Sequence, residues 1–115
     1  MADITIFDKI LSREIPATIV YEDESVLAFR DIQPQAPTHV LVIPKKKVAR
    51  FSELGALPVQ DVGAFFTGVA KVAAHLGLDK NGYRIVINNG RDGQQTVDYL
   101  HAHILGGRGL TWPPG

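Results

Sequence analysis

The chain contains no cysteine among its 115 residues. Without thiols it forms no disulfide framework, has no thiolate nucleophile and offers no cysteine-based zinc or iron-sulfur site. Four histidines remain as the side chains that combine nucleophilic and metal-binding chemistry near neutral pH. Histidine is therefore the first candidate for nucleophilic or metal-binding chemistry in this chain.

The sequence also lacks an excess of charge, with 12 basic and 12 acidic residues and a formal net charge of zero. Nothing in the global charge favours nucleic acid or an anionic membrane, so any phosphate ligand must be held by local groups. No apolar run approaches the roughly 20 residues that span a bilayer, and the N-terminus does not have the layout of a signal peptide. We expect a cytoplasmic protein with one domain over residues 1–115 and with neither a membrane nor a nucleic-acid partner.

Apolar spacing predicts two helices. The first is short and ends before Ile15 and Pro16, and the second follows Pro58, which suits a first turn, and stops at Gly77. The two apolar stripes consist of Ile4, Ile6, Phe7, Ile10 and Leu11, and of Val59, Val62, Phe66, Val69, Ala73 and Leu76.

Five segments read as strands: residues 18–21, 26–32, 39–43, 83–87 and 97–105. An acidic turn at residues 22–25 joins the first two as a hairpin, and the proline-rich residues 33–37 interrupt regular structure before the third. This order predicts a two-layer α+β domain around a mainly antiparallel sheet. Its edge strands need cover, which a second copy of the chain would supply.

The last predicted strand carries His101 and His103 two residues apart, so both side chains and that of Tyr99 are expected on one face. A neutral imidazole attacks phosphorus when its other ring nitrogen donates to a fixed acceptor, so this pair suits a nucleophile and its partner. Two other interpretations remain open. The histidines are simply solvated on a surface strand, or they bind zinc with a third ligand from His39, His75 or a carboxylate.

The loop at residues 88–96, just before this strand, is rich in glycine and amide side chains. Its backbone N–H groups are suited to an anion-binding concavity beside His101, and Gln95 and Thr96 add side-chain donors. A solvated turn is the alternative.

Residues 93–108 read GQQTVDYLHAHILGGR, and residues 112–115 read WPPG. Together with IFDKI (6–10), EIPA (14–17), AFRDI (28–32), QAPTH (35–39) and VIPKK (42–46), these segments resemble the Hint branch of the histidine-triad (HIT) family over nearly the whole chain. The resemblance implies a HIT-like fold and a homodimer, paired across the long helix and a strand into one ten-stranded sheet. It also implies hydrolysis of purine nucleoside phosphoramidates through a nucleotidyl-histidine intermediate, with no cofactor and no metal.

The same resemblance assigns roles to individual residues. His101 is implied as the nucleophile, His103 as the last triad histidine, His39 as a further histidine of the phosphate pocket, and Thr96 as a residue on the leaving-group side. Asp31 is implied to accept hydrogen bonds from both ribose hydroxyls, and Asn88 to contact the phosphate. The apolar walls around the base are implied to be Phe7, Phe29, Ile32 and Leu41, for which core packing is the alternative.

The chain departs from the family pattern at two positions. Tyr99 stands where the first triad histidine is expected, and it does not titrate near neutral pH. Gln94 replaces a glycine expected beside the α-phosphate, which narrows the pocket mouth or adds a donor. Two alternative functions stay open. One is a dinucleoside polyphosphate hydrolase or nucleotidyl transferase of another HIT branch. The other is a non-catalytic nucleotide-binding scaffold dimer, which remains an alternative because Tyr99 replaces a triad histidine.

Overall fold

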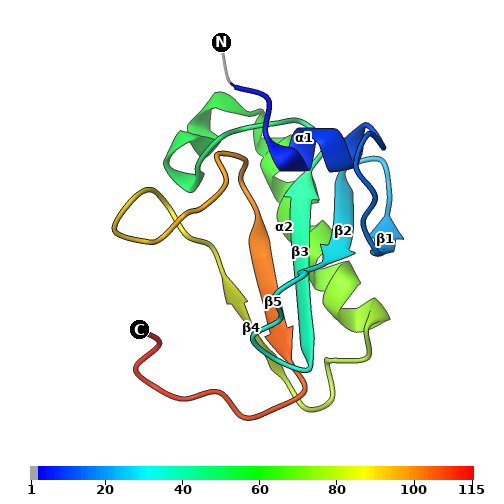
Figure 1. Cartoon of the computed structure of the whole chain (residues 1–115), viewed down its shortest axis with the longest axis vertical. Helices are drawn as coiled ribbons and strands as arrows, with labels where there is room; N and C mark the ends of the chain where they lie inside the picture. Colours follow the sequence, from blue (N-terminus) through cyan, green and yellow to red (C-terminus); the bar gives the residue numbers. More distant parts are fainter. Residues whose placement is uncertain (1–2) are drawn as a thin grey trace.

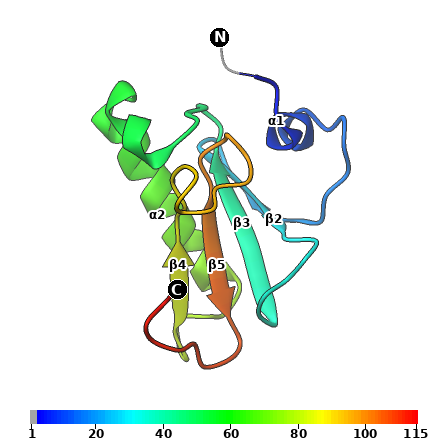
Figure 2. The ribbon, with the colours of Figure 1, turned by 60° about the vertical axis from the view of Figure 1, so that its left-hand side comes forward.

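The structure, a computed structural model, describes residues 3–115 and has a five-stranded sheet with one helix on each face (Figures 1 and 2). The elements follow in the order α1 (Ile6–Leu11), β1 (Ile19–Glu22), β2 (Val26–Arg30), β3 (Thr38–Pro44), η1 (Phe51–Ala56), α2 (Val59–His75), β4 (Tyr83–Val86) and β5 (Ala102–Gly106). The spatial order of the strands is β1-β2-β3-β5-β4, and each neighbouring pair is antiparallel. The predicted α+β class is confirmed, while the short 3-10 helix η1 was not anticipated.

Helix α1 begins at Thr5, whose side chain accepts from the backbone N–H of Asp8 at 3.2 Å. The Asp8 carboxylate in turn accepts from the backbone N–H of Thr5 at 2.7 Å, which completes a capping box. This reciprocal cap offsets the weak intrinsic stability of so short a helix. Phe7 and Ile10 are buried against the sheet, so α1 covers part of the face opposite α2 and partly adds a third layer (Figure 2).

Helix α2 packs on the other face, along β1, β2 and β3. Its buried side runs through Phe65, Val69 and Val72, and a Cβ on Gly68 would lie only 2.7 Å from Val26. The predicted stripe was therefore out of phase at Phe66, which is 39% exposed because neighbouring helical residues differ by about 100° in direction. Val59 is also exposed.

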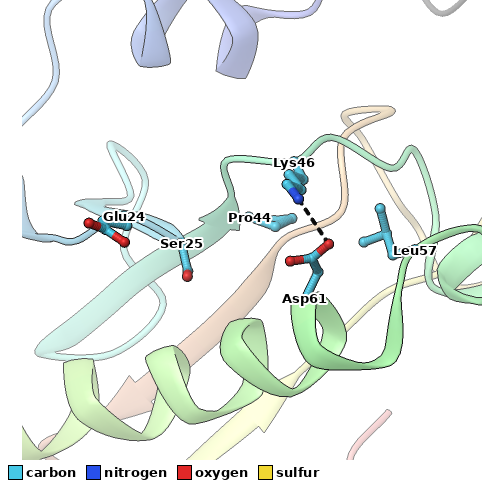
Figure 3. A pocket seen from close by; sticks show the side chains of 6 residues that line it. All are labelled: Glu24, Ser25, Pro44, Lys46, Leu57 and Asp61. Atoms are coloured by element: carbon cyan, nitrogen blue, oxygen red, sulfur yellow. Dashed lines mark hydrogen bonds and ion pairs between the residues drawn. The ribbon is translucent and has the colours of Figure 1, made fainter.

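Two features fix the ends of α2. Gly77 adopts a φ of 75°, the left-handed conformation typical of the residue after a helix. At the other end, Lys46, after β3, pairs with Asp61 in the first turn of the helix at 3.1 Å (Figure 3). Neither helix in residues 3–115 is long and apolar enough to cross a membrane.

The predicted strand at residues 97–105 was too long, because β5 begins only at Ala102. In the β3–β5 ladder Val42 pairs with Ala102, and extending that register would bring Pro44, which has no N–H, opposite Leu100. Leu100 instead donates its N–H to the carbonyl of Val48 at 2.8 Å. The predicted alternation of faces still holds, since Leu100 packs in the α2-side core and Tyr99 in the α1-side core.

Candidate active site

The α1-side face of the sheet carries the candidate site. Leu41 of β3 pairs with His103 of β5, and His39 lies two residues along β3 on the same face. A cavity of about 380 Å³ opens between this face, α1 and the segment that follows α1. Its volume falls within the range of about 300–1,000 Å³ typical of small-molecule sites.

His101 is held in one tautomer and is 4% exposed. Its Nδ1 donates to the main-chain carbonyl of Tyr99 at 2.7 Å, which leaves a lone pair on Nε2. Burial lowers the pKa of His101, although the Tyr99 carbonyl acts in the opposite direction. The Phe7 ring packs edge-on against the imidazole, with centroids 4.9 Å apart. The arrangement provides a neutral, oriented imidazole with a free ring nitrogen.

His39 and His103 form a hydrogen-bonded pair, with Nε2 of His39 and Nδ1 of His103 2.9 Å apart. The backbone N–H of Gln35 donates to Nδ1 of His39 at 3.0 Å, so the ring proton of neutral His39 is on Nε2. His39 therefore donates to His103, whose own proton is on Nε2. Among the buried side-chain polar atoms of residues 3–115, this Nε2 is the one without a hydrogen-bond partner.

Burial keeps both of these rings neutral. It lowers the pKa of His39, and it lowers that of His103 to about 4 together with the neighbouring rings of His101 and His39. His103 thus offers an unpaired N–H donor at the wall of the cavity, the kind of group that binds a phosphoryl oxygen.

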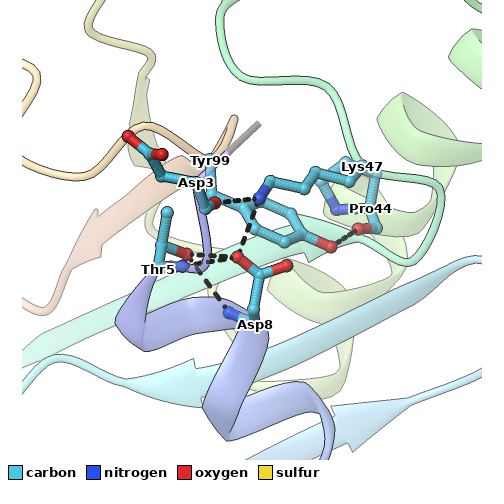
Figure 4. Close-up of polar contacts among 6 residues, drawn as sticks. All are labelled: Asp3, Thr5, Asp8, Pro44, Lys47 and Tyr99. Carbon is cyan, nitrogen blue, oxygen red and sulfur yellow. Dashed lines mark hydrogen bonds and ion pairs between the residues drawn. The ribbon is translucent and has the colours of Figure 1, made fainter. Parts of the chain in front are cut away.

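Tyr99 does not hydrogen-bond to the imidazoles through its side chain. Its fully buried phenol donates to the carbonyl of Pro44, and the Lys47 ammonium lies 5.5 Å from its ring centroid (Figure 4). Lys47 also pairs with Asp8 of α1 at 2.8 Å, which ties the helix to this corner of the sheet. The contribution of Tyr99 to His101 is its main-chain carbonyl.

Asp31 lies at the end of β2 beside His39. Its Oδ1 accepts the backbone N–H of Gln33 at 2.8 Å, and its Oδ2 is 3.4 Å from Nε2 of His39. These partners explain how the carboxylate is tolerated between Phe29 and Ile32. The carboxylate also lines the cavity, where its remaining lone pairs are suited to accept hydroxyl groups.

The structure brings eight of the thirteen expected site residues to the cavity wall: Phe7, Phe29, Asp31, Ile32, Leu41, Thr96, His101 and His103. Phe7 and Leu41 belong to the core as well, each 6% exposed, so wall and core packing are not exclusive for them. Ile32 is 92% exposed and forms a rim. His39 contacts the site through His103, and Asn88, Gln94, Gln95 and Tyr99 lie outside the wall.

The loop at residues 88–96 is folded by its own side chains. Gln95 donates through Nε2 to the carbonyls of Ala49 and Val97, at 2.8 and 2.9 Å, and accepts the N–H of Gly90 at 2.9 Å. The expected side-chain donor is therefore occupied within the protein, and Gln95 shapes the loop. Gln94 is exposed and adopts a φ of 59°, the left-handed conformation that favours glycine.

The site also contains a group of side chains of the types that bind metal ions. Ligand atoms of Asp31, His39 and His103 lie within 4.8 Å of one another, whereas the sequence had suggested His101 with His103. Tetrahedral zinc with bonds of about 2.0–2.1 Å separates two nitrogen ligands by about 3.4 Å. At 2.9 Å, the facing nitrogens of His39 and His103 share a proton instead, so a cation would have to break that hydrogen bond. His75, another suggested ligand, lies on α2 against Tyr21, on the opposite face of the sheet.

Sequence reasoning missed part of the cavity wall, namely Ile6, Ile10, Ile15, Pro16, Ala17, Arg30, Gln33 and Val97. Residues 15–17 are apolar, but the sequence indicated only the end of the first helix at Ile15 and Pro16 and a segment of the family resemblance, with no place at the site. Their place beside β2 depends on how the chain returns after α1, which local pattern does not specify.

Known proteins match the sequence and fold of this chain closely. The family model described as HIT domain matches residues 12–110. The purine nucleoside phosphoramidase of Escherichia coli (strain K12) is 48% identical over 110 residues, covering 96% of this chain and 92% of that protein. A 14 kDa zinc-binding protein of Zea mays is 52% identical over 113 residues, covering 96% of this chain and 88% of that protein.

The crystal structure of a HIT family hydrolase from Legionella pneumophila Philadelphia 1 superimposes with a TM-score of 0.86 at 47% identity, covering 96% of this chain and 98% of that chain. Sequence and fold thus agree over almost the whole length. The chain belongs to the HIT family.

Proposed function

We propose that this protein hydrolyses purine nucleoside phosphoramidates at the P–N bond through a nucleotidyl intermediate on His101. The observation that carries the proposal is the fixed tautomer of His101, whose Nδ1–H is bound to the Tyr99 carbonyl at 2.7 Å. The free Nε2 is thereby available to attack phosphorus beside a cavity of nucleoside size. The E. coli relative named as a purine nucleoside phosphoramidase supports this substrate class.

In the first step Nε2 of His101 forms a bond to the α-phosphorus, and the P–N bond to the amine breaks. Charge grows on the phosphoryl oxygens, where the Nε2–H of His103 and backbone N–H groups of the loop at residues 88–96 are the proposed donors. The amine leaves with a proton, which is proposed to reach it through a relay that includes Thr96 or His103 at the cavity wall. Water then attacks phosphorus and returns a proton to the same relay, the bond to His101 breaks to regenerate the neutral imidazole, and the nucleoside monophosphate is released.

The nucleoside is proposed to lie between α1 and the sheet. Phe7, Phe29 and Leu41 supply apolar surface for a purine, and Ile32 extends it at the rim. Asp31 is proposed to accept the ribose hydroxyls, since its carboxylate lines the same cavity. Asn88 is retained as a phosphate contact from the family resemblance, although it does not line the cavity.

We also propose a homodimer that joins two sheets through β4. This strand is at an edge of the sheet, and its Tyr83 and Ile85 side chains are 37% and 38% exposed. Phe66, on the long helix α2, adds exposed aromatic surface. Pairing of this edge with a second copy would cover unpaired backbone groups and form a ten-stranded sheet. Light scattering on the purified protein tests the dimer directly.

His101→Ala tests the chemistry, because it removes the nucleophile but leaves the proposed base and ribose contacts. We expect turnover of adenosine phosphoramidate to be lost, while AMP binding changes by no more than about tenfold. His75→Ala is the matched control, since this exposed histidine lies on α2 away from the cavity. Wild-type protein quenched at alkaline pH should carry a nucleotidyl mass on the peptide that contains His101, because the P–N bond of the intermediate is labile in acid but not in alkali.

Three outcomes would contradict the proposal. Near-normal turnover by His101→Ala would exclude the covalent mechanism. Cleavage of a dinucleoside polyphosphate in preference to the phosphoramidate would point to another HIT activity. AMP binding with no cleavage of either substrate would indicate a nucleotide-binding scaffold.

A further inference from the structure

A main-chain group outside the candidate site determines which ring nitrogen of His103 carries the proton. Gln35 N–H donates to Nδ1 of His39, His39 Nε2–H donates to Nδ1 of His103, and the proton of His103 is left on Nε2. If the Gln35 N–H moved away, Nδ1 of His39 would be free to carry the proton. His39 would then accept from His103, and the donor at the cavity wall would become an acceptor.

Gln35 is held in place by the segment that follows β5. Arg108 donates through one guanidinium nitrogen to the carbonyl of Gln35 at 2.9 Å and through another to the carbonyl of Gly109 at 3.0 Å. The bond to Gln35 joins residues far apart in sequence. Gln35 itself is exposed and lies in a segment without regular structure. A charged donor to a carbonyl is among the stronger hydrogen bonds of a protein surface.

The approach of the two segments is built into the backbone. Gly107 has a φ of 89°, and a Cβ there would lie 2.9 Å from Cβ of Pro37. Gly106 pairs with Thr38 at the end of the β3–β5 ladder. The chain after β5 therefore turns directly against residues 35–38, which carries the Arg108 guanidinium to Gln35.

We propose that Arg108 is a positioning residue: by holding the Gln35 carbonyl, it keeps the Gln35 N–H on His39 and so fixes the proton of His103 on Nε2. This inference rests on the proposed function for its effect on catalysis, but the effect on the tautomers stands apart from any activity. Arg108 does not line the cavity and acts only through Gln35, His39 and His103.

The direct test is nitrogen NMR of the imidazole rings in the full-length protein at pH 8, where protonated and bare ring nitrogens give separate signals. In the wild type we expect His39 and His103 to carry the proton on Nε2, and His101 to carry it on Nδ1. Arg108→Met keeps the aliphatic stem but removes the donors, and it should give mixed tautomers at His39 and His103. Arg108→Lys, which retains one donor to the carbonyl, should largely restore the wild-type pattern.

Kinetics with adenosine phosphoramidate supply the second measurement. Arg108→Met should lower kcat by about three- to tenfold with KM changed by less than about twofold, because the donor acts on charge that develops in the reaction. Lys80→Ala removes a positive charge from the exposed turn after α2 and serves as the control, with unchanged kinetics and tautomers.

Unchanged tautomers of His39 and His103 in a folded Arg108→Met protein would overturn the inference. A wild-type spectrum in which either ring carries its proton on Nδ1 would overturn it as well. If Arg108→Met does not fold, the Arg108→Lys and wild-type spectra still test the assignment. A wild-type protein without phosphoramidase activity would contradict the proposed function alone, while the NMR comparison would still decide the role of Arg108.

Discussion

Replacement of Tyr99 by histidine separates the side-chain and main-chain contributions of the first triad position. The structure assigns the contact with His101 to the Tyr99 carbonyl, which every residue possesses. The phenol is engaged elsewhere, with Pro44. Tyr99→His should therefore change kcat by no more than about tenfold, equivalent to about 1.4 kcal/mol of barrier.

The same substitution should cost stability. Tyr99 is fully buried and packs near Phe7, with ring centroids 6.3 Å apart. The smaller imidazole loses part of this packing and the bond to the Pro44 carbonyl. Large-to-small replacements in cores and lost hydrogen bonds together suggest a decrease of about 2–4 kcal/mol in the free energy of unfolding. Urea unfolding followed by fluorescence measures it, and kcat should be compared at a temperature where both proteins are folded.

Tyr99→Phe is the matched control, since it keeps the ring and removes only the hydroxyl. We expect a loss of about 1–2 kcal/mol in the free energy of unfolding and an unchanged kcat. A folded Tyr99→Phe protein that has lost more than a hundredfold in kcat would place the phenol in the chemistry and refute this reasoning. A wild-type protein that binds AMP without turnover, and gains several orders of magnitude from Tyr99→His, would do so as well.

Three further predictions concern the charges of the site. Asp31→Asn should weaken AMP binding more than binding of a deoxynucleotide, because an amide does not accept two hydroxyls as a carboxylate does; calorimetry with both ligands checks this, and equal losses would assign Asp31 a structural role. Turnover should survive dialysis against a chelator, whereas loss of turnover with rescue by zinc would contradict the metal-free mechanism and make Asp31, His39 and His103 the candidate ligands. Burial lowers the pKa of His39, His101 and His103, the last to about 4, so folding favours the neutral rings. As the pH falls, the unfolded chain therefore binds protons before the folded protein does. The stabilising effect of the neutral rings should be complete above pH 6.5, the ordinary histidine pKa, and should decrease toward pH 4. Urea midpoints that do not change over this range would contradict the pKa shifts.

Local sequence pattern predicted the two α-helices and the central residues of the strands. Each of these elements buries one face along its whole length, so its apolar residues recur at a regular spacing. It failed where a distant residue decides. The start of β5 depends on Pro44 at the far side of the ladder, and the phase of α2 depends on which of Phe65 and Phe66 meets the sheet. Pro44 lies in β3, outside the sequence of β5, and the sheet surface that buries Phe65 in preference to Phe66 lies outside the sequence of α2.

The candidate site shows the same division. Alternation along residues 99–103 correctly predicted that Tyr99, His101 and His103 share one face, and the structure shows that this is the α1-side face of the sheet. The resemblance to the HIT family then named further wall residues that spacing alone would not select. The role of Gln95 in folding its own loop could not be predicted. Its side-chain amide bonds to the backbone carbonyl of Ala49 and the backbone N–H of Gly90, and local sequence does not show that these groups lie beside it.

The tautomers that the proposed chemistry needs are set by main-chain groups. The Tyr99 carbonyl orients His101, and the Gln35 N–H orients His39 and through it His103. Such groups persist under substitution of their own side chains provided that the backbone stays in place. A changed side chain at a motif position, such as Tyr99, therefore threatens the site less than a change at a residue that holds the backbone, such as Arg108. This argument gives the two substitutions opposite signatures: Tyr99→His should lower stability more than kcat, and Arg108→Met should lower kcat more than stability.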